Sequence, residues 1–496
     1  MTIEQQIYEH SLATPDKVAL ALGAEEITYR RLWEEISRAA RWFQTQGDSG
    51  ERVILSASKS LEFVYCYFGA HLAGKICVPI DPETNETRLR RIVEVTEPRL
   101  IIGELRNRGE YTVLPFSECI SEKQNTPETP EPHELSDTFE SLFPQSFPAE
   151  DAIADLLFTT GTTGLPKGVA LSYANERAAA ANINTFIAND ENDVELLALP
   201  ISHSFGLGRL RCVLSKGATL VLLGSFASMK RFYAAIEQFR VTGFGMVPAS
   251  WSYIRKMSGE RIGRYASQLR YIEIGSAFMS EENKRELMSL LPDTRICMHY
   301  GLTEASRSAF ISFHDDEPHL MTAGKASPNT ELAIFSEQGE RLPNDVDGEV
   351  CVKGDHVCAA YYGMTDEAFR HDFYDGYFRT GDWGHLDAEG YLHLVSRKKE
   401  IINVGGKKVS PQEVEEQLNK IDGIEESACV GIHDDVLGEV VKAYCVCTKD
   451  VDLELAKKTL MKHIENYKIP AIIERIAELP KTQNGKLQRL QLKNIS

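Results

Sequence analysis

A glycine-rich loop between two apolar segments, at residues 156–174, constrains this 496-residue chain more than any other feature. The stretch reads LLFTTGTTGLPKGVALSYA, with one apolar run before the glycines and a second after Lys167. Short apolar runs bounded by glycine and proline are typical of strands. The sequence therefore predicts two strands that hold a loop of glycines, hydroxyl groups and one lysine.

The chemistry of this loop suits a nucleotide polyphosphate. Glycine allows positive φ and a close approach of the backbone to a ligand, and successive backbone N–H groups form a concavity that binds anions. The threonine hydroxyls add donors, and Lys167 adds a point charge that suits phosphate. The loop is not a Walker A sequence, because no Ser or Thr follows Lys167 and the glycine spacing differs. A plain glycine-rich hairpin is the alternative that the loop alone leaves open.

Composition narrows the class of protein. The net charge of −19 argues against nucleic acid as a partner, since phosphates would be repelled. The N-terminus is acidic and lacks an apolar h-region, so we expect no signal peptide. No apolar run is long enough for a transmembrane segment. The ten cysteines are scattered without CxxC pairs, which suits a reducing compartment. We therefore expect a cytoplasmic protein, and its length predicts two to four domains.

Helices and strands alternate along the first half of the chain, which indicates an α/β fold built on parallel strands. A strand followed by a turn recurs several times after the loop, and ligands gather beyond the carboxyl ends of such strands. Gly275-Ser276-Ala277 lies at one such end, and His203 lies at another. A lone histidine such as His203 is more often structural than catalytic. The predicted elements are a helix at 27–45, a strand at 52–58, a helix at 61–74, a buried strand at 75–82, an exposed connection at 121–150, strands at 426–432 and 440–447, and a helix at 453–467.

Two further stretches combine residues that suit a nucleotide. In RICMHYGLTEAS, residues 295–306, Tyr300 offers an aromatic face for a purine. Thr303 can donate to a phosphate, and Glu304 is a hard oxygen ligand for Mg²⁺. The alternative for Thr303 is the N-cap of a helix. In YFRTGDWGHLDAEGYLHLVSR, Asp382 stands in an RTGD turn and can accept from both ribose hydroxyls, unless it only forms the turn.

Together these motifs resemble the adenylate-forming superfamily, which holds acyl- and aryl-CoA synthetases, peptide-synthetase adenylation domains and beetle luciferases. TTGTTGLPKG resembles its phosphate loop, YGLTE its nucleotide motif and RTGD its ribose-binding motif. Lys486, in the C-terminal PKTQNGKLQR, matches the family's adenylation lysine. Phe278 departs from the family, which more commonly has proline beside its adenine-side segment. The resemblance spans essentially the whole chain.

The resemblance implies a large N-terminal domain of layered α/β subdomains at residues 1–398 and a small mobile α/β domain at 399–496, with a hinge at Lys399. It implies His203, Thr303, Glu304 and Lys486 as catalytic residues, with Glu304 also the Mg²⁺ ligand. The implied nucleotide-binding residues are Thr159, Thr160, Gly161, Thr162, Thr163, Gly164, Lys167, Ser276, Ala277, Tyr300, Gly301, Asp382 and Arg397.

The implied reaction joins a carboxylic acid to ATP, releases pyrophosphate, and transfers the acyl group from the adenylate to a thiol. CoA is the favoured thiol, because VGGKKVSPQEVEEQL resembles the CoA-ligase form of this segment. Loading of an acyl carrier protein through its phosphopantetheine is the alternative. A luciferase-like oxygenase and a non-catalytic nucleotide-binding relative are less favoured, the latter because both Lys486 and Glu304 are present.

The acid is only partly constrained by the sequence. Ser204 stands where amino-acid-activating relatives place an aspartate for the α-ammonium group, and an unpaired ammonium in a pocket is costly. An α-amino acid is therefore disfavoured, while fatty, hydroxy and aryl acids stay open. Arg209 and Arg211 follow in the next helix, where we expect them to form salt bridges or be solvated rather than to bind a substrate tail.

Overall fold

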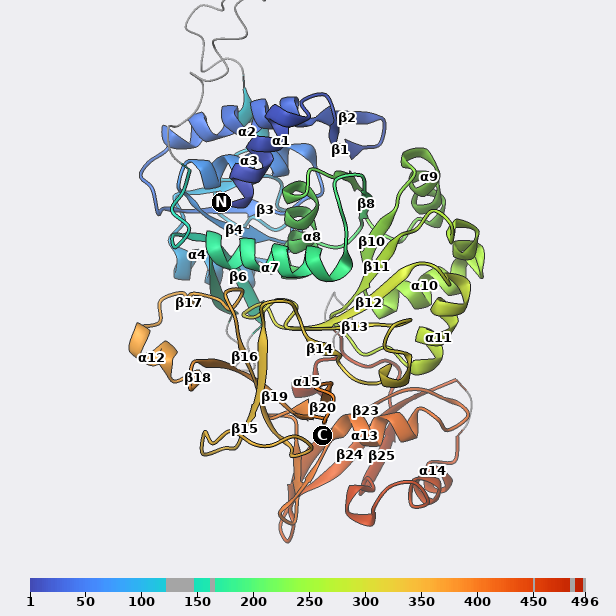
Figure 1. The fold of residues 1–496 in the computed structure, drawn as a ribbon. Coiled ribbons are helices and arrows are strands. Elements are labelled where there is room, and N and C mark those ends of the chain that lie inside the picture. Colours follow the sequence, from blue (N-terminus) through green and yellow to red (C-terminus); the bar gives the residue numbers. More distant parts are fainter. Residues whose placement is uncertain (122–146, 161–165, 449–450, 482–486, 494–496) are drawn as a thin grey trace, which may run out of the picture.

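The computed structural model describes residues 1–121, 147–160, 166–448, 451–481 and 487–493 (Figure 1). The strands of these residues form four sheets. Helices lie between and around the sheets, so the α/β class expected from the sequence is what the chain adopts. Most of the connection expected at 121–150 lies outside the described residues.

The largest sheet has nine strands, and its central part is parallel. Parallel strands place their carboxyl ends at one edge, so the segments that follow β8, β11 and β12 reach a common place. In sheet order the strands are β14 (Lys325–Ala326), β13 (Ala309–Ser312), β12 (Arg295–Tyr300), β11 (Tyr271–Ile274), β10 (Gly243–Met246), β8 (Val194–Leu197), β9 (Thr219–Leu222), β1 (Val18–Leu22) and β2 (Glu25–Thr28).

A six-stranded sheet holds the two strands that flank the glycine-rich loop. These strands, β6 and β7, pair antiparallel, as the sequence predicts. In sheet order the strands are β17 (Ala360–Tyr361), β7 (Pro166–Ser172), β6 (Ile153–Thr160), β4 (Ile76–Ile80), β3 (Arg52–Ser56) and β5 (Leu100–Ile102). The nearby helices are α1 (Ile3–Ala13), α2 (Tyr29–Gln44), α3 (Leu61–Leu72), α4 (Glu86–Thr96) and α5 (Phe116–Ile120), of which α2 and α3 match the predicted helices.

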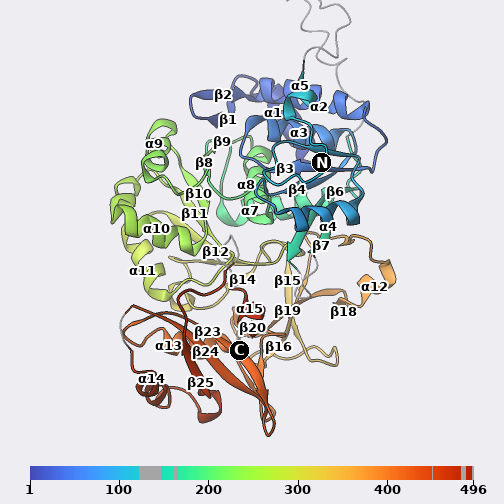
Figure 2. The same cartoon turned by 180° about the vertical axis from the view of Figure 1, so that it is seen from behind.

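Two helices, α7 (Tyr173–Ile187) and α8 (Ser204–Ser215), lie between the six-stranded and nine-stranded sheets (Figures 1 and 2). Ser172 caps the first of them, since its side chain accepts from the backbone N–H of Asn175. Three more helices cover the nine-stranded sheet on its other side with apolar side chains such as Phe232, Trp251 and Leu287: α9 (Met229–Phe239), α10 (Pro248–Ser258) and α11 (Glu281–Leu290).

A third sheet of five strands carries Asp382. Asp382 lies inside β19, and the turn expected at RTGD is therefore wrong. β19 pairs with strands on both sides, and its register against β16 shifts next to Gly381, which has φ of 73°. A bulge therefore stands where the motif suggests a turn. The elements are β15 (Glu331–Phe335), β16 (Gly348–Lys353), β19 (Tyr377–Leu386), β18 (Phe373–Tyr374), β20 (Leu392–Arg397), which pairs with β19, and the helix α12 (Asp366–Arg370).

The C-terminal part forms its own sheet and core. Ser410 caps α13 with Pro411 as the first helical residue, as predicted. The helix expected at 453–467 ends at Leu460, because the next turns close between residues three apart. The elements are β22 (Lys407–Val409), β21 (Ile402–Val404), β24 (Gly438–Cys447), β23 (Ile424–Asp434), β25 (Ile472–Arg475), α13 (Pro411–Leu418), α14 (Leu453–Leu460) and α15 (Arg489–Lys493).

Polar contacts join this C-terminal part to the preceding sheet. The Ser410 hydroxyl donates to the Val395 carbonyl, and the Lys408 ammonium lies 3.9 Å from the centre of the Trp383 ring. Lys399 stands in the turn between β20 and β21. Within the described residues, no helix is long and apolar enough to cross a membrane.

Candidate active site

The predicted adenine-side and acyl-side residues follow parallel strands of the nine-stranded sheet. His203 is the half-buried residue before α8, and Ser276 follows β11 with φ of 74°. A Cβ on Gly275 would lie 2.1 Å from the imidazole of His299, so this position requires glycine. Ala277 is half-buried beside them, and Phe278 is 55% exposed. The strand ends thus place these segments where a ligand of an open α/β sheet binds.

Tyr300, Asp382 and Arg397 form one polar group, which we call the Asp382 cluster. The Tyr300 hydroxyl donates to Asp382 Oδ2 at 2.7 Å, and Arg397 Nε lies 2.9 Å from Asp382 Oδ1. Asp382 is only 6% exposed. Burial, and next the Asp382 charge, raise the pKa of Tyr300 far above its usual value, so the hydroxyl keeps its proton. The Asp382 charge also raises the pKa of Arg397. Asp382 is therefore a fixed anionic acceptor.

Lys167, Glu304 and Tyr361 form a second group, the Glu304 cluster. The Tyr361 hydroxyl donates to Glu304 Oε1 at 2.9 Å, and the Lys167 ammonium lies 4.7 Å from the centre of the Tyr361 ring. Pairing of β17 with β7 sets Tyr361 opposite Val169, two residues after Lys167. Burial, and next the Glu304 charge, raise the pKa of Tyr361. This tyrosine therefore stays neutral and orients one oxygen of Glu304.

The segment from Tyr300 to Glu304 connects the two clusters. It runs without a helix through the described residues 301–308, so the interpretation of Thr303 as a helix N-cap is wrong. The backbone is crowded here, since a Cβ on Gly301 would lie 2.4 Å from the backbone nitrogen of Arg307. Thr303 is half-buried, and its side chain caps no helix.

Part of the predicted site lies outside the described residues. Thr159 is half-buried and pairs in register with Lys167, which is exposed. Thr160 ends β6, and its side chain is not described. Gly161, Thr162, Thr163, Gly164 and Lys486 lie outside the described residues.

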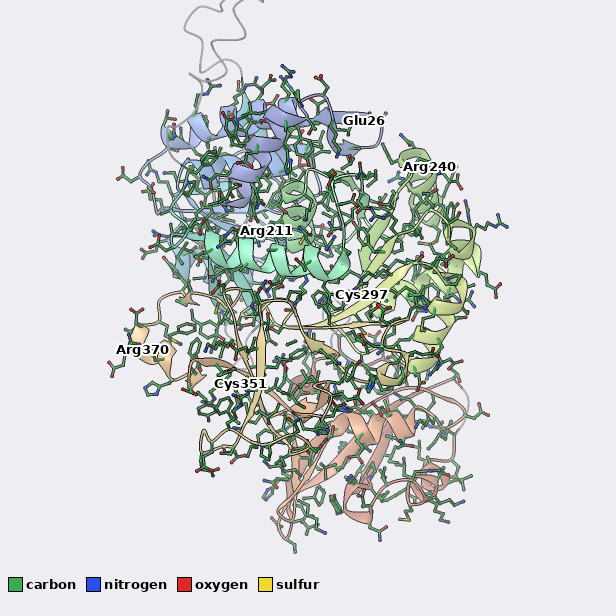
Figure 3. The ribbon with its side chains drawn as sticks, in the orientation of Figure 1. Glu26, Arg211, Arg240, Cys297, Cys351 and Arg370 are labelled. Carbon is green, nitrogen blue, oxygen red and sulfur yellow. The ribbon has the colours of Figure 1, made fainter. Side chains whose placement is uncertain are left out.

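Arg209 and Arg211 form salt bridges, one of the two roles expected from the sequence, but they are buried and not solvated. Arg209 donates to Glu195 through Nε and Nη2, and its Nη1 lies 3.3 Å from Glu273. Arg211 pairs with Asp155 and Glu176, and Figure 3 labels Arg211 beside α7. Buried carboxylates and guanidinium groups must be paired in this way, because an isolated buried charge is costly.

This arrangement fits a magnesium nucleotide. Mg²⁺ binds through one or two carboxylates together with phosphates and water, and the half-buried Glu304 offers the oxygen that Tyr361 does not hold. Lys167 adds a positive charge beside it. A sugar with two hydroxyls fits a buried carboxylate such as Asp382.

Comparison with known proteins agrees with this geometry. A family model described as AMP-binding enzyme matches residues 7–362, and the model of the AMP-binding enzyme C-terminal domain matches residues 413–486. The chain belongs to the AMP-binding enzyme family. The expected superfamily is thereby confirmed.

Relatives of this AMP-binding enzyme include CoA ligases. Sulfoacetate–CoA ligase of Cupriavidus necator is 29% identical over 97% of this chain and 95% of its own length. 4-Coumarate–CoA ligase 1 of Narcissus pseudonarcissus is 29% identical over 90% of this chain and 84% of its own length. The structure of o-succinylbenzoate CoA synthetase from Bacillus subtilis in complex with ATP and magnesium ion has a TM-score of 0.86 and 25% identity, and the match covers 98% of this chain and 99% of that one. These matches confirm the expected fold and the class of acid–thiol ligase.

Tyr361 and Arg307 are two residues of this AMP-binding enzyme that sequence reasoning missed. Tyr361 lies in a two-residue strand far along the chain from Glu304, and only strand pairing brings the two together. Arg307 lies three residues after Glu304 with φ of 57° and 2% exposure. In the sequence, only the short distance between Arg307 and the YGLTE motif indicates a position near the site.

Proposed function

We propose that this AMP-binding enzyme is a ligase that activates a carboxylic acid with ATP and transfers the acyl group to CoA. In the first step a carboxylate oxygen attacks the α-phosphorus of ATP, and pyrophosphate leaves. In the second step the CoA thiolate attacks the acyl carbonyl carbon, and AMP leaves with the bridging oxygen. The observation that supports this function best is that one short segment, Tyr300 to Glu304, joins the Asp382 cluster to the Glu304 cluster.

Roles follow from the chemistry of each cluster. Asp382 accepts from the ribose hydroxyls, while Tyr300 and Arg397 hold its two oxygens in place. Tyr300, Gly301, Ser276 and Ala277 surround the adenine. In these roles Tyr300 keeps its proton, because its pKa is raised far above its usual value, and its hydroxyl continues to donate to Asp382 at neutral pH.

Charge must be screened during the first step, because a carboxylate approaches a polyphosphate. Lys167 and the glycine-rich segment that follows β6 supply part of this screening, and Thr303 donates to a phosphate oxygen. Glu304 would hold Mg²⁺, which would neutralise phosphate charge when bound. Lys486 contacts the carboxylate and α-phosphate as charge develops, and His203 lines the path of the carboxylate.

The first step needs Lys486 at the reacting carboxylate, whereas the second step needs the surface that accepts the thiol at the same place. We therefore propose a domain boundary between residues 1–398 and 399–496, with Lys399 as the hinge. The turn between β20 and β21 is an element boundary that can absorb a change in φ and ψ. Rotation of the smaller part would exchange Lys486 for the surface that accepts the thiol.

CoA is the thiol that we propose, with an acyl carrier protein as the alternative acceptor. The match to sulfoacetate–CoA ligase covers 95% of that enzyme, whereas the match to bacitracin synthase 1 of Bacillus licheniformis covers 9% of that protein. The ten cysteines, all described and free, agree with the proposal of a reducing cytoplasm.

The test is a pyrophosphate-release screen over fatty, hydroxy and aryl acids, with CoA, with phosphopantetheinylated carrier protein, and with neither. We expect acid-dependent pyrophosphate release and a CoA thioester. Thioester on the carrier protein alone would reassign the acceptor, and no acid-dependent release with any acid would refute the function.

A further inference from the structure

A small buried cavity adjoins the predicted reaction centre. It lies between α7, α8 and the segment that follows Tyr300, and its volume of about 20 Å³ is enough for about one water molecule. Ala179, Ala180 and Ile183 form an apolar wall on α7, while Ser204, Thr303 and Arg307 form a polar wall. Because Thr303 belongs both to this wall and to the nucleotide motif, the cavity adjoins the predicted nucleotide site.

Arg307 occupies the part of the cavity next to α8. Its Nη1 donates to the Ser204 carbonyl at 3.0 Å and to Ser306 Oγ at 2.9 Å, and its Nε donates to Glu273 at 3.0 Å. A Cβ on Gly208 would lie 2.7 Å from Nη1, so the glycine leaves this space to the guanidinium. The wall of the cavity next to α8 is therefore formed by the Arg307 guanidinium, a positively charged donor, and not by an apolar side chain.

The other side of the cavity is polar as well. Glu176, 4% exposed, pairs with Arg211 at 2.8 Å. His356 is 1% exposed, its Nε2 lies 3.2 Å from the Ser308 hydroxyl, and its Nδ1 has no hydrogen-bond partner among the described residues. A long hydrocarbon chain would remove water from these groups without replacing its hydrogen bonds, which is unfavourable. An oxygen-bearing tail replaces them.

We propose that the acid of this enzyme is short and carries a hydroxyl group on its tail, which occupies the water-sized cavity at Ser204 and Arg307. This inference rests on the proposed function and specifies its substrate. The apolar wall on α7 contacts the carbons of such a tail. Arg307 Nη2 already donates one N–H to the Phe205 carbonyl, so its other N–H and the hydroxyl groups of the wall donate to the tail oxygen.

The first test compares acids of matched length on the full chain: propanoate with 3-hydroxypropanoate, butanoate with 3-hydroxybutanoate, and octanoate as the long acid. We expect kcat/KM for pyrophosphate release to be at least about tenfold higher for the best oxygen-bearing acid than for its hydrocarbon counterpart. Equal or better use of the hydrocarbon acids would overturn the inference and leave the proposed function intact. No release with any acid, aryl and fatty acids included, would overturn both.

The second test locates the recognition. Ser204→Ala removes a hydroxyl from the cavity while its backbone carbonyl still accepts from Arg307. We expect the ratio of kcat/KM between the oxygen-bearing and the hydrocarbon acid to fall about fivefold or more. Ser289→Ala, on the exposed face of α11, is the matched control and should keep the ratio. An unchanged ratio in a folded Ser204→Ala variant would overturn the placement of the tail in this cavity.

Discussion

Tyr361→Phe isolates the hydrogen bond that orients Glu304. The hydroxyl donates to Glu304 Oε1 at 2.9 Å, whereas the ring itself contacts Lys167 and Phe369. Phenylalanine keeps the ring and removes only the donor. A hydrogen bond to a charged group contributes about 1.5–3 kcal/mol. If that energy holds the carboxylate ready for Mg²⁺, its loss corresponds to roughly a 10- to 150-fold decrease in kcat/KM for adenylate formation.

The assay for this variant is a Mg²⁺ titration of pyrophosphate release at saturating ATP and acid. We expect the Mg²⁺ concentration for half-maximal rate to rise about tenfold or more, because a less ordered carboxylate binds a hard cation more weakly. Tyr362→Phe is the matched control, since Tyr362 is the adjacent tyrosine and its backbone N–H bonds to the Gly168 carbonyl. A Mg²⁺ midpoint and kcat/KM within twofold of the parent would refute the orienting role.

Four other predictions concern single residues. Asp382→Asn should raise the KM for ATP about 10- to 100-fold, because the ribose loses a charged acceptor; steady-state kinetics measure this. Lys486→Ala should abolish adenylate formation more than thiolysis of supplied acyl-adenylate, as single-turnover assays can show. Lys399→Pro should retain adenylate formation but transfer the acyl group poorly in rapid-quench experiments, since proline fixes φ. His356→Gln should reduce the acid sensitivity of folding. Burial lowers the pKa of His356 to about 4 in the folded parent, so below pH 6.5 the unfolded chain binds a proton that the folded chain does not. The free energy of unfolding of the parent therefore falls by roughly 3 kcal/mol between pH 6.5 and pH 4.

Each of these has an outcome that contradicts it. An unchanged KM for ATP would remove Asp382 from the ribose site. Equal losses in both half-reactions would refute the role of Lys486, and normal rates in both would refute the hinge at Lys399. For His356, parallel urea-unfolding curves of parent and variant from pH 7 to pH 4 would show that this residue does not contribute to acid sensitivity.

The order of helices and strands could be predicted, because it depends on local periodicity. The helix at Tyr29–Gln44, the strands that flank the glycine-rich loop and the cap at Ser410 are all properties of a few adjacent residues. The strand ends that hold Ser276 and Tyr300 were predictable for the same reason. The roles assigned to individual site residues stay predictions.

Features that depend on long-range pairing could not be predicted. RTGD has the composition of a turn, yet pairing on both sides draws Asp382 into β19 and leaves a bulge at Gly381. Tyr361 reaches Glu304 only because β17 pairs with β7. Arg307 reaches the cavity through a left-handed backbone conformation, which is rare for arginine and has no composition signal.

The most direct test of the central claim is to identify the nucleotide products of the full chain with ATP, Mg²⁺, CoA and an accepted acid. Anion-exchange chromatography should find AMP, pyrophosphate and acyl-CoA in equal amounts, and omission of the acid should stop all three. Formation of ADP and phosphate, or of AMP without any acid, would contradict the proposed adenylate-forming reaction.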